Sequence, residues 1–215
     1  MRIAFCHNLK TGGSLEEAEY DTQDTVDRLT RALESGGHEV HAINMNGPVS
    51  RLSARLEALR PDLIFNTAEG RTGRLREAFF PLLFEHLKIP FTGGDSFCCA
   101  LTLDKLATKK RAADHGVPTP KAVLVMPPEH ATAASGRGDL RFPVIVKPNY
   151  EGSSIGISGD SVFEDLSTLD AALPHLIVTF PGGILVEEFI AGRDITVGFL
   201  EALDPPVLDP TGYTY

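Results

Sequence analysis

Residues 142–158 read FPVIVKPNYEGSSIGIS, an apolar strand followed at once by a loop of small residues. The strand, residues 144–147, ends on Lys147, and the loop contains two glycines together with Ser153 and Ser154. Small residues let a backbone fold closely over a phosphate chain, so that amide and hydroxyl donors point at its oxygens. The lysine would add a positive charge against the same group. We therefore predict a phosphate-binding loop, with a β-hairpin and a surface lysine as the alternative; the loop matches neither GK[ST] nor GxGxxG.

A basic segment precedes this strand. Residues 101–110 read LTLDKLATKK and are predicted to be helical, which places Lys105 and Lys109 on one face because they are four residues apart. A second phosphate contact and a solvated basic helix face are both consistent with this spacing.

An acidic segment follows the strand. Residues 184–200 read ILVEEFIAGRDITVGFL, in which Glu187 and Glu188 end a predicted strand and Asp194 opens the next one. Neighbouring side chains of a strand point to opposite faces, so at most one of the two glutamates lines a given pocket. Solvated charge at a strand end is the alternative for the other.

The first 93 residues alternate between short apolar strands and amphipathic helices. We predict strands at 2–6, 38–43 and 62–65, separated by a helix that ends at Ser35 and one that carries Leu52, Leu56 and Leu59. Residues 74–88 are also expected to be helical, with Pro81 in the first turn of a new segment. This alternation is typical of a doubly wound parallel sheet in an α/β protein.

The pattern changes after Gly93-Gly94, where we place a domain boundary. Ser96 is the expected N-cap of one helix, and a second helix is expected to run from Asp104 to Gly116. The predicted strands are 121–125, 144–147, 183–188 and 194–200, with one helix near 162–173. Residues 127–139 are small, polar and rich in Pro and Gly, which predicts a surface loop.

The chain has 215 residues, with 20 Lys and Arg against 29 Asp and Glu, a formal net charge of −9. A net negative chain is poorly suited to nucleic acid or anionic lipid, because those contacts need clustered Lys and Arg. Three cysteines without a CxxC pair favour a reducing compartment. No apolar run is long enough for a signal peptide or a membrane span. We therefore expect a soluble cytoplasmic protein without a nucleic-acid or membrane partner.

Six segments, in order along nearly the whole chain, resemble the ATP-grasp superfamily and within it the D-alanine–D-alanine ligases. They are FNTAEG (65–70), IPFTGGD (89–95), LDKLATK (103–109), HGVPTP (115–120), FPVIVKPNYEGSSIGI (142–157) and VEEFIAGRDITVGFL (186–200). The resemblance implies an N-terminal pre-ATP-grasp substrate domain at 1–93, an ATP-grasp central domain at 94–190, and the start of an incomplete C-terminal ATP-grasp domain at 191–215.

The resemblance also implies a nucleotide site. Lys105 and Lys147 match the two lysines that hold ATP phosphates, and Ser153 and Ser154 match the loop that closes over them. The resemblance also implies a catalytic role for Ser154. The strand that surrounds adenine and the acid that binds ribose match the following positions in this chain: Glu187, Glu188, Phe189, Ile190 and Asp194.

For the amino-acid substrate, the resemblance implies that Glu17 in TGGSLEEAEYD, rather than Glu16, faces the cleft between the two domains and anchors an ammonium group. Leu15 and Tyr20 depart from the family pattern in that segment, and Glu69 stands where the D-alanine ligases have a histidine. Both departures bear on whether D-alanine itself is the substrate.

The implied reaction is ATP-dependent carboxylate–amine ligation, in which the γ-phosphoryl group moves to a carboxylate and an amine attacks the resulting acyl phosphate. The cofactors implied are ATP and Mg²⁺, whose ligands are expected in a later C-terminal segment, so no metal ligand is assigned among these residues. A ligase for other amino acids or peptides and a non-catalytic nucleotide-binding module, or half of a two-chain assembly, are the alternatives. The apolar strand at 194–200 would have an open edge, which favours self-association or a homodimer.

Overall fold

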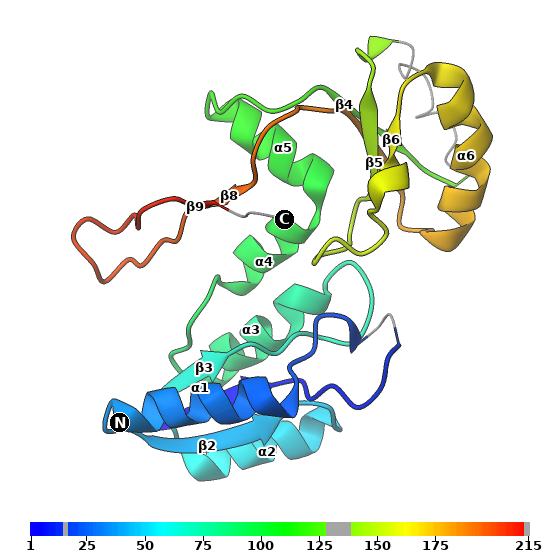
Figure 1. The fold of residues 1–215 in the computed structure, drawn as a ribbon. Helices are drawn as coiled ribbons and strands as arrows, with labels where there is room; N and C mark the ends of the chain where they lie inside the picture. The colour runs from blue at the N-terminus through cyan, green and yellow to red at the C-terminus, as the bar shows by residue number, and fades with distance from the viewer. Residues whose placement is uncertain (15–16, 128–138, 213–215) are drawn as a thin grey trace.

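The computed structural model describes residues 1–14, 17–127 and 139–212 and contains two main β-sheets that are joined by two helices (Figure 1). The first sheet consists of β1 (Arg2–His7), β2 (Glu39–Asn44) and β3 (Leu63–Asn66), all parallel, in the order β2-β1-β3. Together with α1 (Gln23–Ser35), α2 (Val49–Leu59) and α3 (Arg76–Leu87), it forms what we call the N-terminal lobe. The predicted alternation and its parallel pairing are confirmed here.

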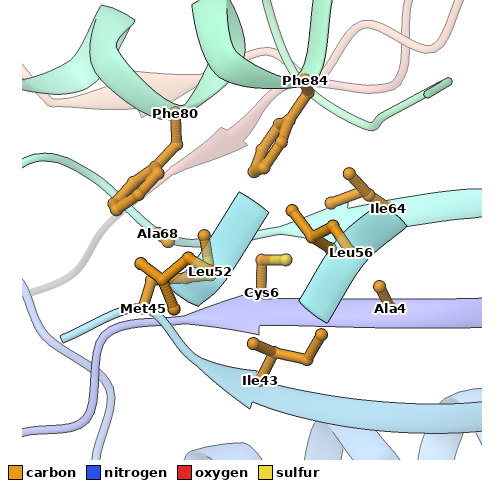
Figure 2. Close-up of a cluster of buried hydrophobic side chains, with 10 residues drawn as sticks. All are labelled: Ala4, Cys6, Ile43, Met45, Leu52, Leu56, Ile64, Ala68, Phe80 and Phe84. Atoms are coloured by element: carbon orange, nitrogen blue, oxygen red, sulfur yellow. The ribbon is translucent and has the colours of Figure 1, made fainter. Parts of the chain in front are cut away.

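The helices of the N-terminal lobe cover both faces of its sheet. Right-handed crossovers in the order β2-β1-β3 require α1 and α2 to lie on opposite faces. Figure 2 shows Leu52 and Leu56 of α2 and Phe80 and Phe84 of α3 meeting over β1 and β3. Leu56 and Phe84 have no measurable exposure. Burying side chains of this size stabilises the fold by about 1.5–3 kcal/mol each.

The second lobe is built on an antiparallel sheet. It consists of β4 (Ala122–Val125), β5 (Val144–Pro148), β6 (Val162–Phe163) and β7 (Ile184–Glu188), in the order β4-β7-β5-β6. Its core contains Val144, Val146 and Val186 from the central strands and Leu169 and Leu173 from α6 (Leu166–Thr179). The predicted strands 121–125, 144–147 and 183–188 are therefore confirmed to within one residue at each end.

Helices α4 (Ser96–Leu103) and α5 (Lys105–Asp114) connect the two lobes (Figure 1). Asp104 lies between them and caps α5 by accepting a hydrogen bond from the amide of Ala107 at 3.0 Å. Both helices agree with the prediction, but the N-cap of α4 is Asp95 rather than Ser96. Ser96 instead donates its hydroxyl to Glu85 at 2.8 Å, and Asp95 accepts from the amide of Cys98.

Two other predicted elements need correction, and a third is not tested. Pro81 lies inside one continuous helix instead of beginning a new one, because Phe80 and Phe84 on either side are buried and hold the helix together. The helix predicted near 162–173 begins at Leu166, where Asp165 caps it, and 162–163 is the short strand β6. Most of the predicted loop at 127–139 lies outside the described residues.

The strand predicted at 194–200 is the largest difference. Its ordered part is β8 (Ile195–Thr196), which pairs with β9 (Thr211–Gly212) in a two-stranded ribbon. Figure 1 shows this segment, which we call the C-terminal arm (residues 189–212), extending away from both sheets. The strand is short because the described chain offers it no wider sheet to join. The most exposed apolar residues of the C-terminal arm are Ile190, Ile195, Phe199, Leu200 and Val207.

Candidate nucleotide-binding site

Two lysines share one buried carboxylate at the centre of the second lobe. The Lys147 ammonium, from β5, pairs with one oxygen of Glu187 on the neighbouring strand β7, and Lys109 Nζ lies 2.9 Å from the other oxygen. Burial opposes ionisation of Glu187, but hydrogen bonds from Lys147 and Lys109 outweigh it and hold the pKa of the carboxyl below its usual value. This carboxylate therefore remains charged and keeps the two ammonium groups close together.

Glu188 faces away from the lysines. Its carboxylate accepts a hydrogen bond from the amide of Arg141 at 3.0 Å and pairs with the Arg141 guanidinium at 2.9 Å. The prediction that Glu187 and Glu188 point to opposite faces is confirmed. On the side of Glu188, a hollow of about 840 Å³ is lined by residues that include Lys121, Arg141 and Ile190.

Lys105 joins the lysine pair from the start of α5. Its ammonium donates to the backbone carbonyl of Glu151, and its amide donates to the carbonyl of Asn149 at 3.2 Å. Burial, followed by repulsion from Lys147, lowers the pKa of Lys105 from its usual value. An anion that replaced the carbonyl contact would relieve this repulsion, as expected of a phosphate site.

Asp104 and Asn149 fix the place of Lys105. The fully buried Asn149 side chain accepts from the amide of Leu106 at 3.0 Å and donates to Asp104 at 2.9 Å. Asp104 also accepts from the Tyr150 hydroxyl at 3.1 Å. These bonds tie the start of α5 to the end of β5, and so bring Lys105 and Lys147 to the same place.

Residues 150–157, the glycine–serine loop, continue directly from this contact. Ser153 and Ser154 are exposed and have φ angles of 43° and 59°, and Gly156 has a φ of 74°. A Cβ on Gly156 would collide with Phe180 and Pro148, so this turn requires glycine. The amides of Ile155 and Ile157 donate back into the loop at 2.8 and 3.0 Å. The loop is thus a tight turn with both serine hydroxyls open to solvent.

The remaining predicted nucleotide residues lie along the start of the C-terminal arm. The amide of Phe189 donates to the carbonyl of Pro143 at 2.9 Å, which holds the chain beside β5 as it leaves β7. The Phe189 and Ile190 side chains are 40% and 64% exposed, and Asp194 directly precedes β8. An apolar strand edge with exposed side chains is a surface on which a planar base could pack.

Glu17 lies in the N-terminal lobe, and the structure does not bring it beside the lysines. Its carboxylate accepts from the Thr11 hydroxyl at 2.7 Å and from the Gly12 amide at 2.5 Å, and these bonds lower the pKa of Glu17. It lines a polar hollow of about 640 Å³ together with Asn44, Asn46 and other residues that all come from positions 11–71. The hollow is formed by this lobe alone, so the prediction that Glu17 faces a cleft between the two domains is not met there. This hollow lies at the carboxyl ends of β1 and β2, where open α/β sheets bind ligands.

Known proteins resemble this chain in sequence. The family description "D-ala D-ala ligase C-terminus" matches residues 113–212. A D-alanine–D-alanine ligase from Aquifex aeolicus is 33% identical over 204 residues, which are 92% of this chain and 64% of the relative. The corresponding ligase from Pseudomonas entomophila is 33% identical over 207 residues, which are 95% of this chain and 61% of the relative. Along most of its length, the chain is therefore similar to D-alanine–D-alanine ligases.

A solved structure supports the same fold along the chain. The D-alanine–D-alanine ligase from Bacillus anthracis complexed with ATP has a TM-score of 0.73 at 21% identity, covering all of this chain and 66% of the ligase. The chain spans about 54–64% of the length of the curated relatives that it matches. Within its described residues, no helix is long and apolar enough to cross a bilayer.

The sequence patterns do not predict several residues that lie in or beside the candidate nucleotide-binding site. Lys109 was noted as a basic helix position, yet its ion pair with Glu187 depends on α5 packing against β7. Arg76, Glu19 and Tyr150 were not predicted at all, although Arg76 is 7% exposed and contacts both of the others. An arginine within the apolar sequence LREAFFPLLF was the one signal in the sequence that could have indicated this buried cluster.

Glu69 belongs to the same cluster, since it accepts a hydrogen bond from Arg76 at 3.0 Å. Burial, together with the charge of Glu19, raises the pKa of Glu69 to about 7, although Arg76 opposes this shift. Glu77 also raises it, and Glu151 contributes a further carboxylate on Arg76 at 3.5 Å. Glu69 therefore changes its charge near neutral pH.

We expect this titration to be visible in stability. Because the pKa of Glu69 is raised on folding, its contribution to stability is present below about pH 4.5 and is lost as the pH rises through about 7. The glutamine of Glu69→Gln cannot titrate. The melting temperature of this variant should therefore fall less between about pH 5 and 8 than that of the wild type, by about 2–4 °C for each kcal/mol of unfolding free energy that the titration of Glu69 removes. Glu34→Gln, at an exposed position of α1, is the control. Parallel curves for Glu69→Gln and wild type in thermal melts would contradict this.

Proposed function

We propose that this chain is the nucleotide-binding part of an ATP-dependent carboxylate–amine ligase that joins amino acids or small peptides. The observation that carries the proposal is the convergence of Lys105, Lys109 and Lys147 beside an exposed glycine–serine loop, on a chain whose net charge is −9. Similarity to the D-alanine–D-alanine ligases supports the choice of reaction. The separate cores of the two lobes support a division between 1–93 and 94–190, and we propose 191–215 as the start of a third domain on the resemblance alone.

In this proposal the lysines and the loop hold the nucleotide phosphates and neutralise their charge. Lys105 and Lys147 each exchange a protein oxygen for a phosphate oxygen, and the Ser153 and Ser154 hydroxyls donate from the other side. Transfer of the γ-phosphoryl group depends mostly on such positioning and charge stabilisation. The adenine would pack against Phe189 and Ile190, with Glu187 and the backbone near Glu188 reading its edge and Asp194 accepting from the ribose.

The residues that would bind Mg²⁺ are not assigned in this proposal. In the described part of the chain, no group of three or more His, Cys, Asp or Glu side chains could hold a metal ion. We therefore assign no Mg²⁺ ligand here and derive no step through the metal.

We further propose that the hollow around Glu17 receives the amino-acid substrate. Its carboxylate stays charged because Thr11 and Gly12 donate to it, and a charged carboxylate attracts an ammonium group. Asn44 and Asn46 add amide groups to the same hollow, which suits a polar zwitterion better than an apolar ligand.

Hydrogen exchange tests the nucleotide proposal directly. Adding ATP with Mg²⁺ should slow exchange at the amides of the glycine–serine loop, because a loop of small residues loses much backbone entropy unless a ligand compensates. We expect a slowing of about tenfold or more at saturating nucleotide. Amides of β1–β3 serve as the internal control. Equal exchange of the loop with and without nucleotide would contradict the site.

A further inference from the structure

Arg76, the first residue of α3, has a buried guanidinium that contacts three separate loops. Its Nε donates to Glu69 at 3.0 Å and its Nη2 donates to Glu19 at 2.9 Å, both within the N-terminal lobe. Its Nη1 donates to the backbone carbonyl of Tyr150 at 2.6 Å, and Glu151 lies 3.5 Å from Nη2. One side chain thus joins the N-terminal lobe to the beginning of the glycine–serine loop.

The same part of the loop is held from other directions as well. The Glu151 carbonyl accepts from the Lys105 ammonium, so consecutive carbonyls of the loop are bound by Arg76 and by Lys105. Gly152 packs directly on Glu19, and a Cβ at this position would overlap with the Glu19 carboxylate. The segment 150–152 therefore rests on the N-terminal lobe, in a place fixed by Arg76 and its carboxylate partners.

The charges in this cluster explain why Arg76 is difficult to replace. Three carboxylates, those of Glu19, Glu69 and Glu151, surround a single guanidinium whose side chain is 8% exposed. Burial opposes the charge of Arg76, but the bond to Glu19 and the other carboxylates outweigh it and raise the pKa of the guanidinium. A lysine carries the same charge on a single ammonium group, so it cannot reproduce the planar guanidinium, which donates to several partners at once.

We propose that Arg76 is a positioning residue, which sets the place of the glycine–serine loop relative to Lys105 and Lys147. It acts through Tyr150 and Glu151 and does not itself touch the nucleotide. The N-terminal lobe thereby determines how the loop closes over the phosphates. The consequence for affinity rests on the proposed function, whereas the consequence for loop order does not.

The first test exchanges Arg76 for lysine in the nucleotide-free chain. Arg76→Lys should speed exchange at the amides of Ile155 and Ile157 by about tenfold or more, because the loop then loses the hydrogen bond that Arg76 donates to the Tyr150 carbonyl. Amides of β1–β3 should keep their rates, which shows that the lobe remains folded. Arg28→Lys is the matched control, since Arg28 forms an exposed 2.9 Å pair with Asp24 on α1.

The second test keeps Arg76 and instead disturbs the contact between Gly152 of the glycine–serine loop and Glu19 of the N-terminal lobe. Gly152→Ala introduces a methyl group against Glu19 and should speed exchange at Ile155 and Ile157 in the same direction. Gly159→Ala is the matched control, because a Cβ there would meet open space. Unchanged loop exchange in Gly152→Ala, or in a folded Arg76→Lys, would overturn the proposal.

Calorimetry with ATP and Mg²⁺ separates this inference from the proposed function. Arg76→Lys should bind about tenfold more weakly than the wild type if the loop is displaced from the lysines. Faster loop exchange without any nucleotide binding by the wild type would refute the nucleotide site and support the positioning role. Wild-type affinity in a variant whose loop exchanges faster would overturn the link between loop position and phosphate binding.

Discussion

Lys147→Ala should weaken ATP binding by about 10- to 150-fold, which corresponds to the 1.5–3 kcal/mol typical of a hydrogen bond with a charged partner. Lys147 ends β5 at the point where the glycine–serine loop begins, and its ammonium lies on Glu187. Its removal takes away one phosphate contact and leaves Glu187 paired with Lys109 alone, so that a partly uncompensated carboxylate faces the phosphates. Both effects reduce affinity.

Calorimetry on the folded variant measures this change. Lys110→Ala removes an exposed lysine from the same helix that carries Lys105 and Lys109, and should leave the affinity unchanged within about twofold, as expected of a screened surface charge. An affinity for ATP that is the same in Lys147→Ala and in wild type would remove Lys147 from the nucleotide site. A loss of equal size in Lys110→Ala would indicate a non-specific effect of net charge.

Local sequence patterns were sufficient for most of the elements that present these lysines. An apolar run followed by Lys147 predicts a strand end, and the alternation of side chains along a strand separates Glu187 from Glu188. These features depend on residues that are close in sequence. The same reasoning placed Lys105 and Lys109 on one face of α5, where they approach Glu187 and the glycine–serine loop.

The Arg76 cluster could not be predicted in this way. Arg76 meets Glu19 across 57 residues of sequence and Tyr150 across 74, so no local period connects them. A charged residue at the start of a helix is normally solvated, and its burial depends on the approach of the second lobe. The strand predicted at 194–200 failed for a related reason, since a strand also needs partners. In the described chain it pairs only with its own arm, at Ile195 and Thr196 and through a bridge between Phe199 and Val207.

The C-terminal arm should make this chain self-associate. Ile195 and Phe199 are 61% and 65% exposed, and more apolar side chains of the same segment are exposed beside them. The ribbon of β8 and β9, continued by the bridge between Phe199 and Val207, pairs the arm only with itself. The outer edge of such a two-stranded ribbon is a template for pairing with another chain. Pro205 and Pro206 cannot extend a ladder, so they limit how far such pairing can continue. Association should therefore be centred on residues 194–200.

Replacing Ile195 and Phe199 with serine together should weaken this association at least about 100-fold, because each apolar side chain contributes about 1.5–3 kcal/mol when it is buried. Sedimentation equilibrium measures the change. Val178→Ser is the matched control, since Val178 is 81% exposed on α6, in the second lobe rather than on the arm. A wild-type chain that remains monomeric at high concentration would contradict the role of the arm.

The relatives' greater length suggests what should cover the arm in a working ligase. In a chimera that joins the C-terminal third of a D-alanine–D-alanine ligase after residue 212, the exposed side chains of β8 should be buried by neighbouring strands. Such a chimera should be monodisperse and should release ADP from ATP when amino acids and Mg²⁺ are present, whereas residues 1–215 alone should bind ATP without releasing ADP. The comparison also separates a ligase from a non-catalytic nucleotide-binding module, which would bind ATP in both forms and release ADP in neither. Amino-acid-dependent ADP release by a clean monomer of the short chain would overturn the expectation, because carboxylates within residues 1–215 would then have to hold the metal.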